Sequence, residues 1–251
     1  MEAYTDFAYL YDTFMEDVPY EDWATLLSSL IKAYGNNVHS LVDLGCGTGT
    51  LTMMMYDRGF EVTGVDISED MLSVAADKSM EEGKDILYIR QDMSELKLFD
   101  KVDVIYSVCD CINYLITDED IINCFKAVYD NLVKDGLFIF DFNTIYKYET
   151  VIGDTTIAEN REDCSFIWDN FYSPEDHINE YDVTFFVSED EDSELFRRFI
   201  EIHIQRGYTL EEMKQFADKA GFKFVVALDE ANHKSITDDS ECERVYVILR
   251  K

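Results

Sequence analysis

The stretch Ser40-Leu-Val-Asp-Leu-Gly-Cys-Gly-Thr-Gly49 decides the fold that we expect for this chain. Residues 41–44 read as a short apolar strand, and a helical pattern begins near Thr50, directly after a glycine-rich turn. The glycines of this turn stand at alternate positions, Gly45, Gly47 and Gly49. Because glycine has no side chain, such a turn can bend sharply and bring its backbone close to a ligand. The stretch therefore predicts a strand-turn-helix unit that binds a ligand at the turn.

Two carboxylates accompany the turn. Asp43 stands two residues before Gly45, and Asp66 ends the next apolar strand, Glu61-Val-Thr-Gly-Val-Asp66. Neighbouring parallel strands end at the same edge of a sheet, so Asp66 is placed to accept hydrogen bonds from a ribose diol. Cys46 lies inside the turn, where we expect a small filler rather than a reactive thiol. The arrangement predicts a nucleoside-binding crevice at the carboxyl ends of parallel strands.

The spacing Asp43-x-Gly45-x-Gly47-x-Gly49 resembles motif I of the class I S-adenosylmethionine (SAM)-dependent methyltransferases. The dinucleotide-binding pattern G-x-G-x-x-G has a different glycine spacing. The order of the elements, Asp66, Asp92 and a late β-rich insertion extend the resemblance over the whole chain. It includes the pattern Glu201-x-His203-x-Gln205-Arg206-x-Tyr208 and the terminal strand at Glu243-Arg244-Val245. Within the class, the chain is similar to a bacterial group and, more distantly, to sugar-amine N-methyltransferases with a similar insertion.

The resemblance implies a Rossmann-like methyltransferase fold of the α/β class. Its sheet is doubly wound, seven-stranded and mostly parallel, with the last strand inserted antiparallel. The pattern divides the chain into a SAM-binding domain, residues 1–142 and 209–251, which begins with an aromatic N-terminal arm at residues 1–20. Residues 143–208 lose helical periodicity and read as antiparallel strands. We therefore expect an inserted antiparallel β subdomain that covers the substrate at the edge of the active site.

Composition narrows the class of partner. The chain has 251 residues, which fits one large domain or one domain with a substantial insertion, and 47% of them are hydrophobic, enough for a full core. Lys and Arg number 21 against 53 Asp and Glu, so the net charge of −32 repels phosphate backbones and anionic membranes. We expect neither a nucleic-acid partner nor a membrane partner, and either a monomer or a homodimer.

The sequence also carries signals about location and metals. No apolar run approaches the ~18 residues of a membrane span, and residues 1–7 lack the basic and apolar regions of a signal peptide. Six cysteines without an export signal read as free thiols in a reducing cytoplasm. The pair Cys109-x-Cys111 is too closely spaced for the usual zinc half-site, so no metal is expected.

The resemblance implies a cofactor role for residues at several strand ends. The segment Phe7-Ala8-Tyr9-Leu10-Tyr11-Asp12 matches an arm that folds over the methionyl half of SAM, which points to Tyr11 and Tyr20. In the family an acid at the position of Asp92 meets the adenine amino group, and the next backbone N–H meets a ring nitrogen. Asp92 is also compatible with a simple loop cap. The complete set implied for SAM is Tyr11, Tyr20, Asp43, Gly45, Cys46, Gly47, Gly49, Asp66, Ile67, Met71, Asp92, Met93 and Cys109.

Absent motifs narrow the reaction. No Asn/Asp-Pro-Pro-Tyr/Phe motif follows the fourth strand, Asp103–Val108, and Cys109 and Cys111 lack the preceding proline of cytosine-C5 enzymes. A C-x₃-C-x₂-C radical cluster is absent as well. What remains is SN2 transfer to an oxygen, nitrogen or carboxylate of a small molecule, in a site that mainly aligns two reactants.

The candidate base is Tyr114, Asp110 or His203. Tyr114 and Asp110 follow the fourth strand, at the reacting end of the ligand, and an ordinary histidine pKa suits proton removal. His203 on an alternating strand is equally compatible with a satisfied core or surface histidine. The candidate substrate residues are Asn113, Tyr114, Trp168 and Arg206. Arg206 is a potential bidentate ligand for a carboxylate or phosphate, although pairing with local acids is the simpler expectation.

Three other functions stay compatible with the sequence. They are methyl transfer to RNA or protein, SAM binding without catalysis, and NAD(P)-dependent oxidation or reduction, against which the glycine spacing argues.

Overall fold

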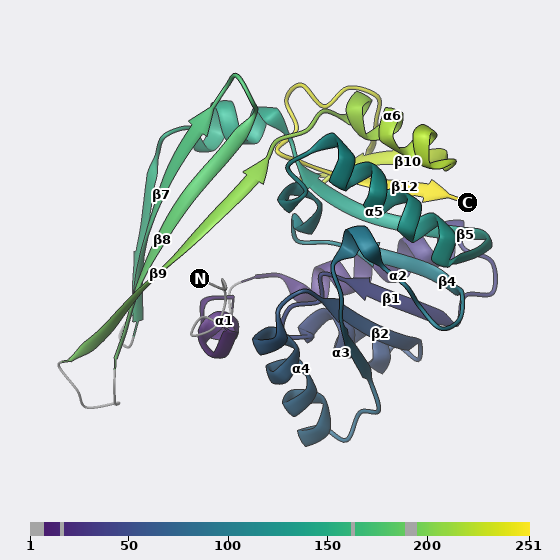
Figure 1. The fold of residues 1–251 in the computed structure, drawn as a ribbon, viewed down its shortest axis with the longest axis horizontal. Helices are drawn as coiled ribbons and strands as arrows, with labels where there is room; N and C mark the ends of the chain where they lie inside the picture. The colour runs from purple at the N-terminus through teal and green to yellow at the C-terminus, as the bar shows by residue number, and fades with distance from the viewer. Residues whose placement is uncertain (1–7, 16–17, 162–163, 189–194) are drawn as a thin grey trace.

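The structure, a computed structural model, describes residues 8–15, 18–161, 164–188 and 195–251. Two sheets organise these residues, an eight-stranded main sheet and a four-stranded insertion sheet (Figure 1). Phe7 of the predicted arm lies outside the described residues, as does the acidic run at residues 189–192, which the sequence predicts to be a solvated turn. No helix of the described part is both long and apolar enough to pass through a bilayer.

The main sheet has the order β11-β10-β12-β5-β4-β1-β2-β3. Its first five strands in the chain are parallel to one another, and β12 lies antiparallel between β5 and β10. The bounds are β1 Ser40–Leu44, β2 Glu61–Asp66, β3 Leu87–Arg90, β4 Val102–Ser107, β5 Leu132–Asn143, β10 Lys223–Asp229, β11 Ser235–Ile236 and β12 Arg244–Arg250. This confirms the predicted doubly wound sheet with its antiparallel last strand, and adds the two-residue edge strand β11.

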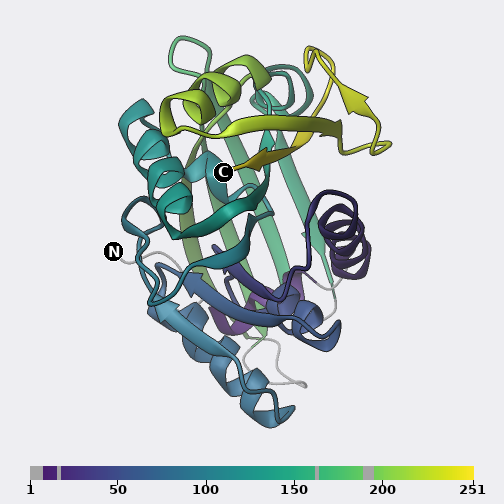
Figure 2. The same ribbon diagram turned by 90° about the vertical axis from the view of Figure 1, so that its right-hand side faces the viewer.

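Helices cover both faces of the main sheet. The helices are α1 Ala8–Phe14, α2 Tyr20–Tyr34, α3 Thr50–Asp57, α4 Glu69–Glu81, α5 Asp118–Asn131 and α6 Leu210–Ala220. Successive strand residues point to opposite faces, so Val42 packs in the core with α5 and α6, while Leu41 packs with α2 and α3. In Figure 2 the dark purple α2 lies on one side of the sheet, and the teal α5 and yellow-green α6 lie on the other.

The sequence predicts an N-cap at Ser68, a capping box at Thr209 and Glu212, and a helix end at Gly221, and the structure contains all three. The Ser68 side chain accepts a hydrogen bond from the backbone N–H of Met71 at the start of α4. Thr209 and Glu212 form a reciprocal capping box at α6, which ends at Gly221 in the left-handed conformation. These caps satisfy N–H groups that a helix leaves without partners, so local sequence is enough to fix where α4 and α6 begin.

One predicted turn lies inside a strand. The sequence suggests a turn at Asp135-Gly136, whereas β5 runs from Leu132 to Asn143 with a register shift against Val102 and Val104. Asp135 absorbs the irregularity with a φ of 63°. The turn residues therefore make a local kink, because β5 continues to pair with β4 on both sides of it.

The insertion sheet is antiparallel in the order β6-β7-β8-β9. Its strands are β6 Thr156–Asn160, β7 Cys164–Ser173, β8 Ile178–Ser188 and β9 Phe196–Arg206. The sequence predicts strands at residues 166–172, 178–187 and 196–205, which correspond to β7, β8 and β9, but it does not predict β6. The inner face covers α1, because the Phe14 ring lies 4.7 Å from that of Phe185 and 6.0 Å from that of Phe166. Figure 1 shows α1 between the insertion sheet and the main domain.

Candidate functional site

A cavity of about 950 Å³ lies at the carboxyl ends of β1, β2, β3 and β4. Residues that follow these four strands form its floor, and aromatic side chains of the arm and of the insertion sheet close it from the other side. Residues from distant parts of the chain therefore meet at one edge of the main sheet, as expected for a doubly wound fold.

The glycine turn and Asp66 are joined by backbone hydrogen bonds. The Asp66 carboxylate accepts from the backbone N–H of Gly47 at 2.8 Å and from that of Ser68 at 2.9 Å. Burial raises the pKa of Asp66, although these N–H groups oppose the shift. Gly45 has a φ of 86°, and a Cβ there would lie 2.6 Å from the Cys111 sulfur. Gly45, Cys46, Gly47 and Asp66 all line the cavity.

Asp43 lies beneath the turn. It is 3% exposed and accepts a hydrogen bond of 2.6 Å from the Thr52 hydroxyl. Burial raises the pKa of Asp43 to about 7. Cys46 behaves as the expected filler, since it packs against Gly64 and burial raises the pKa of its thiol.

Gly49 was predicted to contact the cofactor, but it does not line the cavity. Its φ is 76°, and a Cβ there would lie 2.6 Å from the Tyr88 hydroxyl oxygen and 2.9 Å from the Ala75 Cβ. The third glycine is therefore required by close packing against α4 and β3, and not by the approach of a ligand.

The end of β3 supplies another wall. Asp92 and Met93 line the cavity, together with Ile67 and Met71 from the start of α4. Asp92 also caps the short helix η1, Met93–Glu95, by accepting a hydrogen bond of 2.8 Å from the Ser94 N–H. Asp92 therefore caps the loop and also lines the cavity, two roles that the sequence left as alternatives.

The arm closes the cavity near the glycine turn. Tyr11 and Tyr20 both line it, and burial raises the pKa of each phenol. Asp12 fastens α1 to the main domain: it accepts hydrogen bonds from the Thr48 hydroxyl at 2.6 Å and from the Lys78 ammonium at 2.5 Å. The arm is thus tied both to the glycine turn and to α4.

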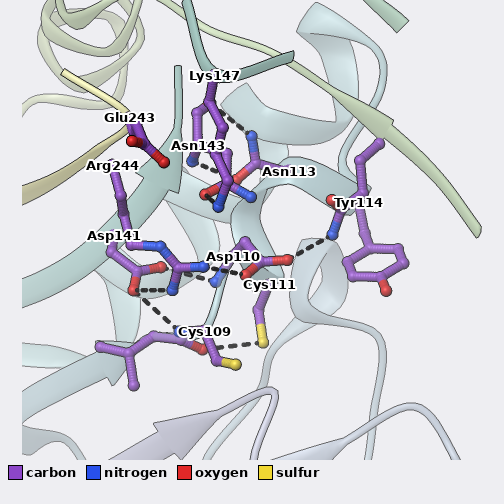
Figure 3. A network of polar contacts seen from close by, with 12 residues as sticks. Cys109, Asp110, Cys111, Asn113, Tyr114, Asp141, Asn143, Lys147, Glu243 and Arg244 are labelled. Atoms are coloured by element: carbon purple, nitrogen blue, oxygen red, sulfur yellow. Dashed lines mark hydrogen bonds and ion pairs between the residues drawn. The ribbon is translucent and has the colours of Figure 1, made fainter. Parts of the chain in front are cut away.

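The loop after β4 has unusual backbone geometry. Cys109 and Asp110 have φ values of 66° and 53°. The Asp141 carboxylate accepts from both of their N–H groups, and Arg244 forms ion pairs with Asp110 at 2.6 Å and Asp141 at 3.1 Å (Figure 3). Burial raises the pKa of the Cys109 thiol to about 12, so the thiol stays protonated.

A group of polar aromatic side chains faces this loop from the insertion sheet. The Tyr114 hydroxyl lies 2.9 Å from Nδ1 of His203, and the His203 ring stacks on Tyr181 at 5.0 Å. Trp168, the next ring in the row, lies 5.0 Å from Tyr181 and also lines the cavity. Burial lowers the pKa of His203 to about 4. The ordinary histidine pKa that the sequence led us to expect is therefore not found, and His203 is a weaker base than an exposed histidine.

Two predicted substrate residues do not reach the cavity. Asn113 is fully buried, and its side-chain amide donates hydrogen bonds to the backbone carbonyls of Asn143 and Arg206. The Arg206 guanidinium pairs with Asp118 at 2.7 Å and Glu212 at 3.2 Å. Asn113 ties the loop after β4 to the insertion, and Arg206 pairs with local acids, which was the simpler expectation.

The structure adds residues that sequence reasoning did not assign to the site. Arg244 lines the cavity, as do Phe14 of α1 and the β8 side chains Tyr181, Val183 and Phe185. The alternation of β8 marks these three side chains as sharing one face, although it does not say which face is inward. Arg244 lies in the terminal strand pattern Glu243-Arg244-Val245, in which no local signal marks it as a site residue.

Comparisons with known proteins agree with this geometry. The sequence profile of the methyltransferase domain matches residues 41–136. A protein of Geobacillus sp. (strain WCH70), provisionally named as a methyltransferase, is 33% identical over 99% of this chain and 100% of its own length. The crystal structure of a SAM-dependent methyltransferase from Clostridium acetobutylicum ATCC 824 has a TM-score of 0.86 at 28% identity, covering 98% of both chains.

The fold is shared more widely. The sugar N-methyltransferase KedS8 from Streptoalloteichus sp. ATCC 53650 has a TM-score of 0.77 at 15% identity, over 96% of this chain and 93% of that one. At this low sequence identity, the structural similarity supports a shared fold and nothing more. The full-length similarity to methyltransferases sets the oxidoreductase alternative aside. The chain belongs to the class I SAM-dependent methyltransferases.

Proposed function

We propose that the chain transfers the methyl group of SAM, by in-line SN2 displacement, to a small neutral or cationic organic acceptor, and releases S-adenosylhomocysteine. The observation that carries the proposal is that one cavity joins the nucleoside-binding strand ends to the inner face of the insertion sheet. Its volume of about 950 Å³ lies near the upper end of the usual range for small-molecule sites. That size supports the presence of a cofactor and an acceptor together.

The order of the strands supports a placement for the cofactor. Asp66 at the end of β2 would accept the ribose hydroxyls, while Asp92 and the Met93 N–H, which follow β3, would bind the adenine edge. Since β1 and β4 follow β2 in the sheet, a ligand anchored at β2 and β3 must extend over the glycine turn toward Cys109. Tyr11 and Tyr20 would cover its methionyl half from the arm, as both line this part of the cavity.

Charge argues against an anionic acceptor. The cavity wall includes Asp43, Asp66, Asp92 and Asp110, and Arg244 is the one Lys or Arg among the described lining residues. Its guanidinium already pairs with Asp110 and Asp141. A carboxylate or phosphate would therefore enter a negative site without a free partner, whereas the SAM sulfonium and a basic acceptor would be attracted. The proposed acceptor is therefore not a carboxylate, although the sequence alone allows one.

The available bases favour nitrogen as the nucleophile. His203, with a pKa of about 4, is too weak to deprotonate an alcohol effectively. The two Asp110 oxygens already accept hydrogen bonds, one from Arg244 at 2.6 Å and the other from Gln205 at 2.7 Å, so both are engaged within the protein. A neutral amine attacks with its own lone pair and needs little base, whereas a cationic amine must first release its proton to solvent. In this reaction Tyr114 would orient the nucleophile, held in place by its hydrogen bond to His203.

Calorimetric titration tests the cofactor site. We expect SAM and S-adenosylhomocysteine to bind, and NADH not to bind. Asp66→Ala should weaken SAM binding at least about tenfold, since a hydrogen bond to a charged acceptor contributes roughly 1.5–3 kcal/mol. Glu69→Ala is the matched control, because it removes a carboxylate that pairs with Arg90 and whose side chain is 79% exposed. Equal SAM affinity in the two variants would remove Asp66 from the site.

The acceptor class is tested with labelled SAM. Metabolite, RNA and protein fractions of a bacterial extract are incubated separately with the enzyme. We expect label in small basic metabolites. Efficient labelling of bulk RNA or protein, with none in the metabolite fraction, would contradict the small-molecule acceptor and favour a macromolecular one.

A further inference from the structure

The Cys109–Asp110 loop needs an external restraint. Both residues have left-handed backbone conformations, with φ values of 66° and 53°, and neither is glycine. Residues with a Cβ pay a steric cost in this region, so they keep such a conformation only where the surroundings impose it. The loop lies directly after β4 and lines the cavity.

Asp141 supplies this restraint from the neighbouring strand. Its carboxylate accepts from the Cys109 N–H at 3.0 Å and from the Asp110 N–H at 2.8 Å. Two successive backbone N–H groups in such a loop converge on one anion. Asp141 is 0% exposed and does not line the cavity, so it acts on a ligand only through the loop.

Arg244 completes the arrangement from β12. One guanidinium nitrogen donates to Asp141 at 3.1 Å and the other donates to Asp110 at 2.6 Å, so a single planar group bridges both carboxylates (Figure 3). Lysine carries the same charge but cannot reproduce this fork. Gln205 of β9 donates to the second Asp110 oxygen at 2.7 Å, which connects the insertion sheet to the same loop.

The loop faces the part of the cavity farthest from Asp92. The strands lie in the order β4-β1-β2-β3. Asp66 ends β2 and Asp92 follows β3, whereas the loop follows β4 at the other end of this series. The Cys111 thiol donates to the Gly45 carbonyl at 3.4 Å, so the loop also touches the glycine turn. A ligand whose adenosine occupies the β2 and β3 ends would place its amino-acid tail against this loop.

We infer that Arg244 and Asp141 are positioning residues, which hold the Cys109–Asp110 backbone in the conformation that receives the amino-acid tail of SAM. The inference rests on the proposed function. Neither residue takes part in methyl transfer itself. Arg244 and Asp141 affect the binding of the amino-acid tail of the cofactor, whereas Asp66 and Asp92 bind its adenosine half.

Two ligands separate this role from a general structural one. S-adenosylhomocysteine carries both halves of the cofactor, whereas 5′-methylthioadenosine lacks the amino-acid tail. Calorimetry with Arg244→Lys should show at least about tenfold weaker binding of S-adenosylhomocysteine, since charged hydrogen bonds are lost, with 5′-methylthioadenosine within twofold of the parent. The isosteric Asp141→Asn should show the same split. Arg250→Lys, on the same strand, is the matched control, because Arg250 bonds the carbonyls of Asp135 and Tyr34 far from the loop.

The other outcomes overturn the inference. Unchanged S-adenosylhomocysteine affinity in Arg244→Lys would show that the loop needs no such restraint. Equal weakening of both ligands, including complete loss through misfolding, would assign the two residues a general structural role. If the parent protein binds neither ligand, the proposed function itself fails, and the inference fails with it.

Discussion

Burial acts on two ionisable side chains of the site in a way that the sequence conceals. Asp43 has its pKa raised to about 7 and His203 has its pKa lowered to about 4. Both shifts favour the neutral form, because desolvation penalises charge of either sign. The site therefore contains a carboxyl that is partly protonated near neutrality and an imidazole that stays neutral well below it.

The shift at His203 predicts a pH dependence of stability. Well above pH 6.5 the imidazole is neutral in the folded and unfolded states, so it contributes no slope. As the pH falls from 6.5 to 4, the unfolded chain takes up a proton that the folded chain excludes, and stability is lost. The loss attributable to His203 should approach about 3 kcal/mol near pH 4.

Denaturant unfolding at several pH values checks this prediction. His203→Gln keeps a polar side chain that can bond Tyr114 but removes the titration, so its unfolding free energy should fall less steeply than that of the parent in this window. His39→Gln, which removes an exposed imidazole, serves as the control. Identical slopes in the parent and in His203→Gln would contradict the low pKa.

At the scale of elements, the strand-turn-helix unit from β1 to α3 combines two different uses of glycine. Gly45 and Gly47 line the cavity, while Gly49 allows β3 and α4 to pack against the turn. A glycine that receives a ligand and a glycine that permits packing are indistinguishable in a motif, because both need a left-handed backbone.

Gly49→Ala should destabilise the fold more than the same change at Gly59. Both glycines are left-handed, with φ values of 76° and 89°, so alanine costs about 1–2 kcal/mol of backbone strain at either position. At Gly49 the new Cβ also meets Tyr88 and Ala75, whereas at Gly59 nothing lies within 4 Å. We expect an extra loss of about 1–3 kcal/mol at Gly49, measured by urea unfolding. Equal losses in both variants would show that Tyr88 moves aside freely.

At the scale of the whole molecule, the cavity forms only where three parts of the chain meet. The main sheet supplies the floor, the insertion sheet supplies one wall, and α1 fills the space between them. Asp12 is the point at which α1 is fastened, through Thr48 of the glycine turn and Lys78 of α4.

Asp12→Ala should therefore weaken cofactor binding without unfolding the domain. Loss of the hydrogen bonds to Thr48 and Lys78 lets α1 separate from the glycine turn, and we expect SAM affinity to fall about tenfold. Stopped-flow dissociation should locate most of the change in the off-rate, since α1 covers the bound ligand. Asp57→Ala is the control: it removes an ion pair with Lys84 that lies outside the cavity lining. SAM dissociation as slow as in the parent would mean that α1 only packs against the domain.

The sequence by itself determined the order of elements and the cofactor crevice. Strand, glycine turn, Asp66 and the Ser68 cap lie within about 30 residues of one another, and each follows from local spacing or periodicity. Strands β7 to β9 were equally readable from their alternation. Such features need no knowledge of distant residues, because backbone hydrogen bonding and side-chain alternation act along the chain.

Tertiary structure alone decided which polar residues face the ligand. Asn113 bonds a carbonyl 93 positions away, and Arg206 turns to local acids instead of the cavity. Arg244 reaches Asp110 across 134 positions, and His203 is neutral because the fold desolvates it. Hydrogen-bond partners and burial depend on how β5, β9 and β12 pack together, and no local pattern records that packing.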